Sequence, residues 1–254
     1  AQKGKKEQKE QTQAEDKPLI PALPLDTLRS MKMKGTLGVG KLKVKKLNLQ
    51  NIVLELRAND GVIEADPFKL DLYQGNLNSA SRIDVRQKTP VMNIDAGVQG
   101  VQAGELLKDY SGKGFLSGTG NLGLDISTKG MTKSELTRAL NGKLSFKFED
   151  GTIKGLDILN KIRSALRSLK GQKIEQAATK ETEFTLLSAS ADITNGLLKN
   201  EDLLLKSPLL QAKGRGTVDL SEEKLNYALR TTIPKDLEGE LGSDLKQLAG
   251  MTVP

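Results

Sequence analysis

The sequence predicts a mainly β chain with a few short helices, folded as one long antiparallel meander. Apolar and polar residues alternate in the run 41–50 (KLKVKKLNLQ) and in most segments that follow, which is typical of strands with one apolar face. Asn-Asp-Gly at 59–61 and Asn-Gly at 195–196 separate such runs, and they suit hairpin turns because Gly takes positive φ without steric cost. The chain's 25 glycines also supply the bends that a long sheet needs.

The N-terminal residues differ in composition from the rest of the chain. Residues 1–17 are mostly Lys, Glu and Gln, with little that could be buried, and Pro18, Pro21 and Pro24 follow. We therefore expect residues 1–27 to form a charged and then proline-containing linker, disordered or extended. One β-rich domain should then occupy residues 28–254.

Three short helices are expected to interrupt the strands, near residues 104–110, 132–140 and 157–170. In the second, Thr132 and Glu135 have the spacing of a capping box. The third has its apolar residues on one stripe and Lys and Arg on the other side, which favours packing across a sheet face over lying on a membrane surface. Residues 171–182 are polar, and we expect a mobile loop there.

The composition excludes several classes of chemistry. The chain has no His, Cys or Trp, so Ser-His-Asp and Cys-His nucleophiles, His or Cys metal sites and disulfides are ruled out. Gly118, Gly120 and Gly123 match a G-x-G-x-x-G pattern, but alternation continues there as a strand, where a dinucleotide site would need a helix. We expect no enzymatic activity, no metal and no cofactor.

One lysine-rich stretch accounts for most of the net charge of +7. Six lysines lie between Lys32 and Lys46, and residues 31–50 contain no Asp or Glu. The stretch could be a solvated strand face whose lysines protect an open sheet edge. It could also contact anionic lipid head groups, for which Lys41, Lys43 and Lys45 are the candidates. Nucleic acid is not an expected partner, because no aromatic residues for base stacking are interleaved.

The C-terminal third carries a family resemblance. The segment from Thr182 to Pro234 resembles the C-terminal region of the AsmA family, with Asn195-Gly196, then Gly-Arg-Gly-Thr-Val-Asp-Leu at 214–220 and Leu-Asn-Tyr-Ala-Leu at 225–229. Residues 139–158 (ALNGKLSFKFEDGTIKGLDI) are similar to the family's strand, turn and following helix. The resemblance consists of turns and strands in the right order and contains no catalytic signature.

The resemblance implies a fold and a location. AsmA-family proteins are related to TamB-type bridge-like lipid-transfer proteins, so a long curved antiparallel sheet is expected, forming a groove or taco-like half-barrel with helices packed on it or capping it. It also implies the periplasm of a Gram-negative bacterium, with an inner-membrane anchor outside this chain, because no uncharged stretch here exceeds the eleven residues 114–124.

The implied function is support of outer-membrane assembly and lipid homeostasis, with phospholipid or another acyl-chain lipid carried along the apolar groove. The alternative is a structural or interaction module whose sheet edges contact outer-membrane assembly proteins and assist or regulate protein targeting. Either the groove is open to lipid, or the same residues fill a closed core. The groove candidates are Ile52, Leu54, Leu56, Leu203, Leu205, Val218, Leu220, Tyr227 and Leu229.

Overall fold

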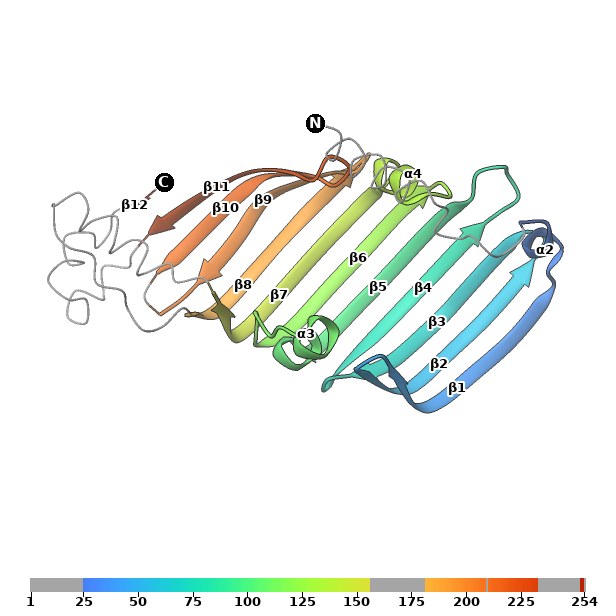
Figure 1. The fold of residues 1–254 in the computed structure, drawn as a ribbon, viewed down its shortest axis with the longest axis horizontal. Coiled ribbons are helices and arrows are strands. Elements are labelled where there is room, and N and C mark those ends of the chain that lie inside the picture. Colours follow the sequence, from blue (N-terminus) through green and yellow to red (C-terminus); the bar gives the residue numbers. More distant parts are fainter. Residues whose placement is uncertain (1–24, 156–180, 209, 233–251, 254) are drawn as a thin grey trace, which may run out of the picture.

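The alternating segments form strands that pair in chain order. The structure, a computed structural model, describes residues 25–155, 181–208, 210–232 and 252–253. Each strand pairs antiparallel with the next, giving one twelve-stranded sheet in the order β1 to β12 (Figure 1). The strands are β1 (Met33–Val44), β2 (Leu47–Asn59), β3 (Val62–Leu72), β4 (Gly75–Asp84), β5 (Val91–Gln102), β6 (Thr119–Lys129), β7 (Asn141–Lys154), β8 (Glu181–Thr194), β9 (Leu197–Lys206), β10 (Gln211–Asp219), β11 (Lys224–Thr232) and β12 (Thr252–Val253).

The sheet does not close into a barrel, since β1 pairs only with β2 among the described strands. The mainly β antiparallel fold predicted from the sequence is therefore confirmed. The helices lie at the ends of the strands, with α3 at one end and α2 and α4 at the other (Figure 1). No helix among the described residues is both long and apolar enough to cross a membrane.

Two of the predicted helices are present with nearly the predicted bounds, α3 (Ala103–Ser111) and α4 (Lys133–Arg138). The capping box of α4 is formed: the backbone N–H of Glu135 donates to Thr132 Oγ1 at 3.2 Å, and that of Thr132 donates to Glu135 Oε2 at 3.3 Å. The helix predicted at 157–170 lies outside the described residues.

Two predicted boundaries differ from the structure. Residues 25–27 of the linker predicted for residues 1–27 belong to the helix α2 (Leu25–Ser30), and residues 1–24 lie outside the described part of the chain. Leu28 is buried, and Arg29 donates from Nε to the Val85 carbonyl at 2.8 Å and from Nη2 to the Gln87 carbonyl at 3.0 Å, so tertiary contacts hold this short helix. Of the loop predicted at 171–182, residues 181 and 182 belong to β8, and the other residues lie outside the described part of the chain.

The strand register gathers the apolar side chains on one face, which we call the apolar face. Residues directly opposite each other on paired strands point to the same side. One such row crosses β4 to β8 and is apolar throughout: Leu77, Val98, Leu122, Phe146 and Ala189. A neighbouring row on the opposite, outer face is polar: Arg57, Glu64, Arg82, Asn93, Ser127 and Asn141.

Bulges bend the strands without exchanging the two faces. On β2 the apolar series steps by two up to Leu49 and then by three to Ile52, and the β2–β3 register shifts between Gln50 and Val53. On β5 the step from Val98 to Val101 coincides with a register shift and with Gly100 at φ 68°. Each bulge accommodates one extra residue in the strand and increases the local bend. The apolar residues before and after the bulge therefore stay on the same face. The sheet is accordingly curved.

Close backbone contact at Gly75 tests this bent geometry. A Cβ on Gly75 would lie 2.4 Å from the Gln99 carbonyl oxygen and 2.6 Å from the Val101 nitrogen, and both atoms are backbone. Gly75→Ala should therefore destabilise the domain by roughly 1–3 kcal/mol, the usual cost of overpacking. Urea unfolding followed by circular dichroism measures this cost.

The matched control is Gly38→Ala, also in a strand, where a Cβ would meet nothing within 4 Å. It should leave stability unchanged or raise it by up to about 1 kcal/mol, because alanine restricts the unfolded chain. Equal loss of stability in the two variants would contradict the packing at Gly75.

Candidate functional site

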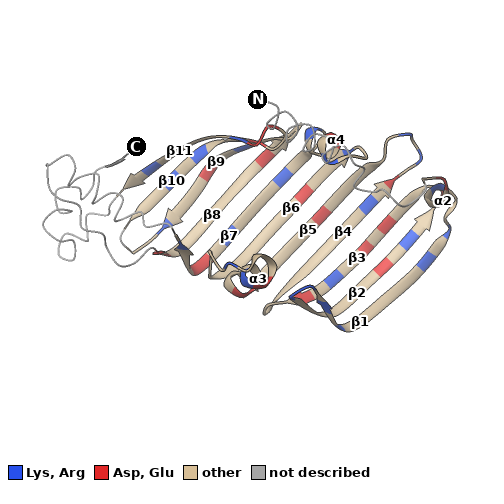
Figure 2. Ribbon diagram, in the orientation of Figure 1, with Lys and Arg blue, Asp and Glu red and all other residues tan. Residues whose placement is uncertain are grey.

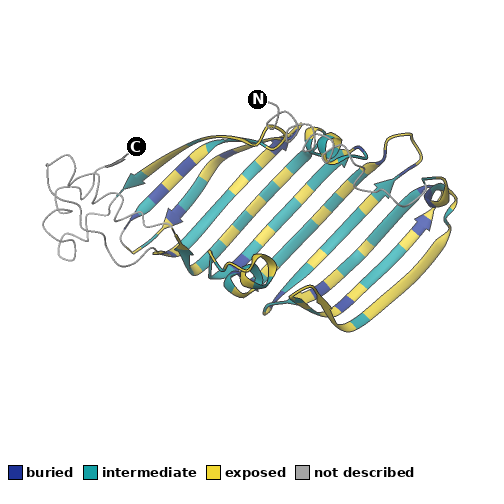
Figure 3. Ribbon diagram, viewed as in Figure 1, coloured by how far each residue is buried: buried dark blue, intermediate teal, exposed yellow. Residues whose placement is uncertain are grey.

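The apolar face is the candidate site because no second layer of described residues covers its centre. Outside the pairing of neighbouring strands, the main contacts between described elements are those of α2 with β2, α3 with β2 and β5, and α4 with β6. Leu122 lies in the middle of the apolar row and is still 36% exposed. Figure 3 shows mostly exposed and half-buried positions along the central strands, with few buried ones. The described residues therefore leave the centre of the apolar face accessible.

The three groove candidates on β2 share the apolar face. Leu54 lies opposite Leu37 on β1 and Phe68 on β3, and Ile52 and Leu56 flank it at two-residue spacing. Ile52 is buried by the protein's own residues, whereas Leu54 and Leu56 are half-buried. Leu54 and Leu56 are thus the members of this group with surface left for a ligand.

At the other end of the sheet, three candidates converge over a glycine. A Cβ on Gly214 would lie 2.7–2.8 Å from Leu203 Cδ2, Tyr227 Cε1 and Leu229 Cδ2, so the absence of a side chain there lets all three pack on β10. Leu229 remains 54% exposed. This group forms an apolar surface over β9 to β11.

The three remaining groove candidates lie in different environments. Val218 lies on the apolar face opposite Leu198 and Leu225. Leu220 follows β10 in a turn, where its N–H donates to the Gly196 carbonyl at 3.0 Å. Leu205 is only 4% exposed.

Leu205 belongs to a closed core at one end of β8 to β10. The cluster comprises Phe184, Leu205, Leu210 and Ala212, and Leu116, Phe148, Ile153 and Leu187 pack against it. Here the apolar residues fill a closed core, which is the second of the two alternatives that the sequence leaves open. At Leu122 the face is open. Sequence reasoning did not single out Leu122, although its place in the alternating run 119–129 indicates its face.

One buried polar cluster interrupts the apolar face near β11. Asn200 is 4% exposed, accepts a hydrogen bond from the Tyr227 hydroxyl, and donates from Nδ2 to the Ser190 carbonyl at 2.6 Å and to Asp202 Oδ1 at 2.7 Å. Burial, together with the nearby charge of Asp202, raises the pKa of Tyr227, so the hydroxyl stays protonated and donates. The cluster anchors β9 to β8 and β11.

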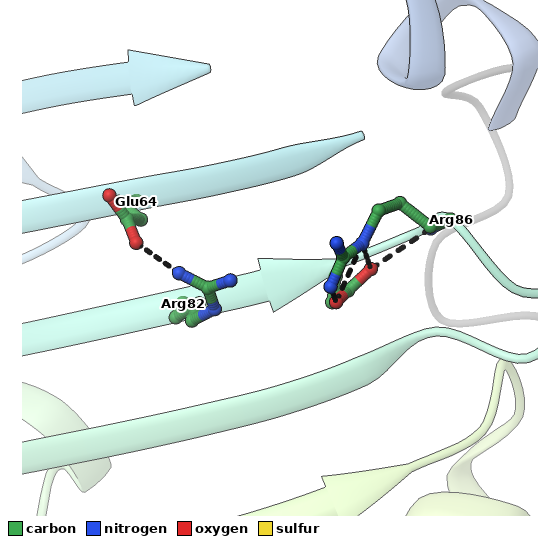
Figure 4. Close-up of polar contacts among 4 residues, drawn as sticks. Glu64, Arg82 and Arg86 are labelled. Atoms are coloured by element: carbon green, nitrogen blue, oxygen red, sulfur yellow. Dashed lines mark hydrogen bonds and ion pairs between the residues drawn. The ribbon is translucent and has the colours of Figure 1, made fainter. Parts of the chain in front are cut away.

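The outer face carries ion pairs instead. Figure 2 shows Lys and Arg interspersed with Asp and Glu along the strands. Arg82 pairs with Glu64 on the neighbouring strand, and Arg86 Nε donates to Asp84 Oδ1 at 2.9 Å where β4 ends (Figure 4). Hydrogen bonds from Arg86 lower the pKa of Asp84 to about 2.

The head-group candidates lie on β1 and in the turn that follows it. Lys41 and Lys43 are exposed and lie opposite Gln50 and Asn48, and Lys45 is in the turn. None of the three forms an ion pair with any described residue. Lys41 and Lys43 thus share a face of the sheet with the polar residues of β2, whereas Leu47 and Leu49 point to the other face.

A polar cleft of about 960 Å³ lies between α3 and the ends of β2 to β4, and the sequence did not predict it. Its lining includes Tyr73, whose hydroxyl donates to Asp109 Oδ2 at 2.6 Å and accepts from the Asn48 N–H at 3.4 Å. Its other polar residues, such as Gln50 and Glu105, suit water better than an acyl chain. The described residues contain no cluster of acidic side chains that could hold a metal ion.

Comparisons with known proteins agree with the resemblance seen in the sequence. The AsmA family model matches residues 1–203, so it includes the N-terminal segment and leaves out β10 and β11, where part of the sequence pattern lay. Protein AsmA of Escherichia coli (strain K12) is 19% identical over 189 residues, which are 74% of this chain and 30% of that protein. The chain thus spans less than a third of that relative. No solved structure matches the chain significantly.

The polar cluster at Asn200 gives a stability prediction. Asn200→Ala should lower the free energy of unfolding by about 1–3 kcal/mol, because the Tyr227 hydroxyl and the Ser190 carbonyl lose a buried partner. Asn226→Ala, an exposed position on the outer face of β11, should change it by less than about 0.5 kcal/mol. Chemical denaturation of both variants measures the difference, and equal effects would contradict the role of the cluster.

The Arg86–Asp84 pair gives a pH prediction. Because the folded-state pKa of Asp84 lies below its ordinary value of 3.8, the pair stabilises the fold above pH 3.8, and this contribution is lost as pH falls toward 2. Carboxyl carbon NMR should show Asp84 titrating near pH 2 in the native chain. In Arg86→Gln the titration should return toward the ordinary value, and an unchanged midpoint would show that Arg86 is not the cause.

Proposed function

The chain belongs to the AsmA family, and on that premise we propose that it carries phospholipid acyl chains along its apolar face in support of outer-membrane assembly and lipid homeostasis. We place it in the periplasm of a Gram-negative bacterium, held at the inner membrane by an anchor outside this chain. The mechanism requires no bond making, which fits a chain without His or Cys.

The continuous apolar row with an accessible centre is the observation that carries this proposal. Leu77, Val98, Leu122, Phe146 and Ala189 lie side by side across β4 to β8, and Leu122 is 36% exposed. An acyl chain lying on such a surface gains about 0.8 kcal/mol for each buried methylene and needs no specific polar contact. Neighbouring strands offer nearly equivalent surfaces, so a lipid can move from one to the next without a deep energy minimum.

The head group would remain in water at the margin of the sheet while the acyl chains lie on the apolar face. Lys41, Lys43 and Lys45 were the sequence candidates for contacting it. Lys41 and Lys43 lie in line with polar residues of β2, away from Leu54, so a lipid on the apolar face reaches them only by bending around the edge of β1. The alternative function, an interaction module working through sheet edges, is supported by the edge of β1 that no described strand pairs with.

Photocrosslinking in living cells tests lipid carriage. A benzoylphenylalanine placed at Leu122 in the full-length protein should form phospholipid adducts, detected by mass spectrometry of the purified protein. The same probe at Asn121, the adjacent residue on the outer face, should give few or none. Leu54 and the exposed Val53 on β2 provide a second pair of opposite faces.

A blocking variant completes the test. Leu122→Asp places a charge in the centre of the apolar row and should abolish lipid adducts at Leu54, whereas Asn121→Asp should leave them. Circular dichroism establishes that both variants fold. Equal lipid labelling of both faces, or labelling by proteins alone, would rule out transport along the apolar face.

A further inference from the structure

Two serine side chains of β4 lie on the apolar face. Leu77 of the apolar row, Ser79 and Ser81 follow one another at two-residue spacing, and the pairing of β4 with β5 has no register shift between them. Alternate residues of a strand point to the same side of the sheet. Ser79 lies opposite Phe68 on β3 and Ala96 on β5, so the hydroxyls lie among apolar side chains.

Neither serine hydroxyl has a hydrogen-bond partner among the described residues. Two other polar side chains of the apolar face are bonded within the protein: Thr128 Oγ1 donates to the Leu136 carbonyl at 2.6 Å, and Asn200 belongs to the polar cluster near β11. No buried side-chain oxygen or nitrogen of the described residues lacks a partner. The hydroxyls of Ser79 and Ser81 therefore reach the surface.

Both serines lie in the interior of the sheet. β4 pairs with β3 on one side and with β5 on the other over nearly its whole length. The main contacts of the described helices are with β2, β5 and β6. The neighbours of the two hydroxyls on the apolar face are thus the side chains of the flanking strands, and all of these are apolar.

Side-chain size does not explain serine at these positions. Elsewhere on the apolar face the small residues include alanines, such as Ala65, Ala96 and Ala189. Alanine is no larger than serine, so it would fit equally well beside Phe68. The hydroxyl group itself is the feature that packing does not require.

A hydrocarbon chain alone is a poor ligand for this part of the face. Hydrocarbon laid over a hydroxyl removes its water, and a hydroxyl left without a partner weakens binding roughly tenfold or more. A carbonyl oxygen avoids this loss, because it accepts a hydrogen bond from the hydroxyl. A phospholipid with ester-linked chains supplies both groups, since its carbonyls lie where its apolar chains begin.

We propose that Ser79 and Ser81 bind the ester carbonyls of a phospholipid that lies on the apolar face. Such a site rests on the proposed function, because it needs a lipid on that face, and it adds where along the sheet the lipid is held. A diacyl lipid has two ester carbonyls, and the hydroxyls, about 7 Å apart along one strand, can each donate to one of them. The acyl chains then extend over the apolar residues on either side, toward Phe68 on β3 and Leu122 on β6.

Competition between two phospholipids tests the site. The probes are phosphatidylethanolamines with the same chains, one ester-linked and one ether-linked, because the ether lipid has no carbonyls. Full-length protein carrying benzoylphenylalanine at Leu122 is irradiated with an equimolar mixture, and mass spectrometry measures the ratio of the two adducts. The ester lipid should be enriched about twofold to tenfold, the gain expected of a hydrogen bond.

Alanine substitution locates the preference. Ser79→Ala combined with Ser81→Ala removes both hydroxyls without adding volume, and the adduct ratio should fall to about one. The control, Ser127→Ala with Ser145→Ala, makes the same change on the outer face of β6 and β7 and should keep the preference. Circular dichroism establishes that both double variants fold.

The outcomes separate this site from lipid carriage itself. An equal ratio in the unsubstituted protein, or a preference that survives Ser79→Ala with Ser81→Ala, would overturn the role of the serines, while lipid adducts at Leu122 would still support carriage. Loss of the preference in the outer-face control would overturn it as well, because the effect would not be local. Absence of adducts with both lipids would overturn the site and lipid carriage together.

Discussion

Strand register is the constraint on which the rest of the structure depends. In a sheet, a shift of one residue moves a whole strand's side chains to the opposite face. Here the register keeps one face apolar over many strands although several strands are bulged. It does so because the spacing of the apolar residues in the sequence changes from two to three at the same places where the strand register shifts. On β3 the apolar series steps from Ala65 to Phe68, and the β3–β4 register shifts between the same two residues. The bulges are thus encoded as three-residue steps in an otherwise two-residue pattern.

This coding explains how much of the fold could be predicted. Alternation, the Asp-Gly and Asn-Gly turns and the Thr132–Glu135 capping box are local signals, and the structure confirms the strands and the helix that they predicted. The helix α2 could not be predicted in this way, because Leu28 and Arg29 are held by contacts with residues far along the chain. Leu205 is a similar case. Its face follows from the alternation, but its burial depends on Leu210 and Leu116, which come from connecting segments.

Burial and accessibility are divided between different parts of the same face. At one end of β8 to β10, connecting segments fold back and Phe184 and Leu205 are buried as in an ordinary core. At the other end of the sheet, α2 buries Leu28 near β2. Between these places Leu122 remains accessible. The described part of the sheet is therefore held together by its ladder of backbone hydrogen bonds and by local cores near its ends, while Leu122 at its centre stays exposed.

The outer face follows a related principle for charge. Across β6 to β9, Asp125, Lys143, Asp192 and Lys199 lie opposite one another in turn, so each charge has a neighbour of the other sign. Such a row is complete only where a strand has two neighbours. Among the described strands β1 pairs with β2 alone, and Lys41 and Lys43 face the neutral residues Gln50 and Asn48 there.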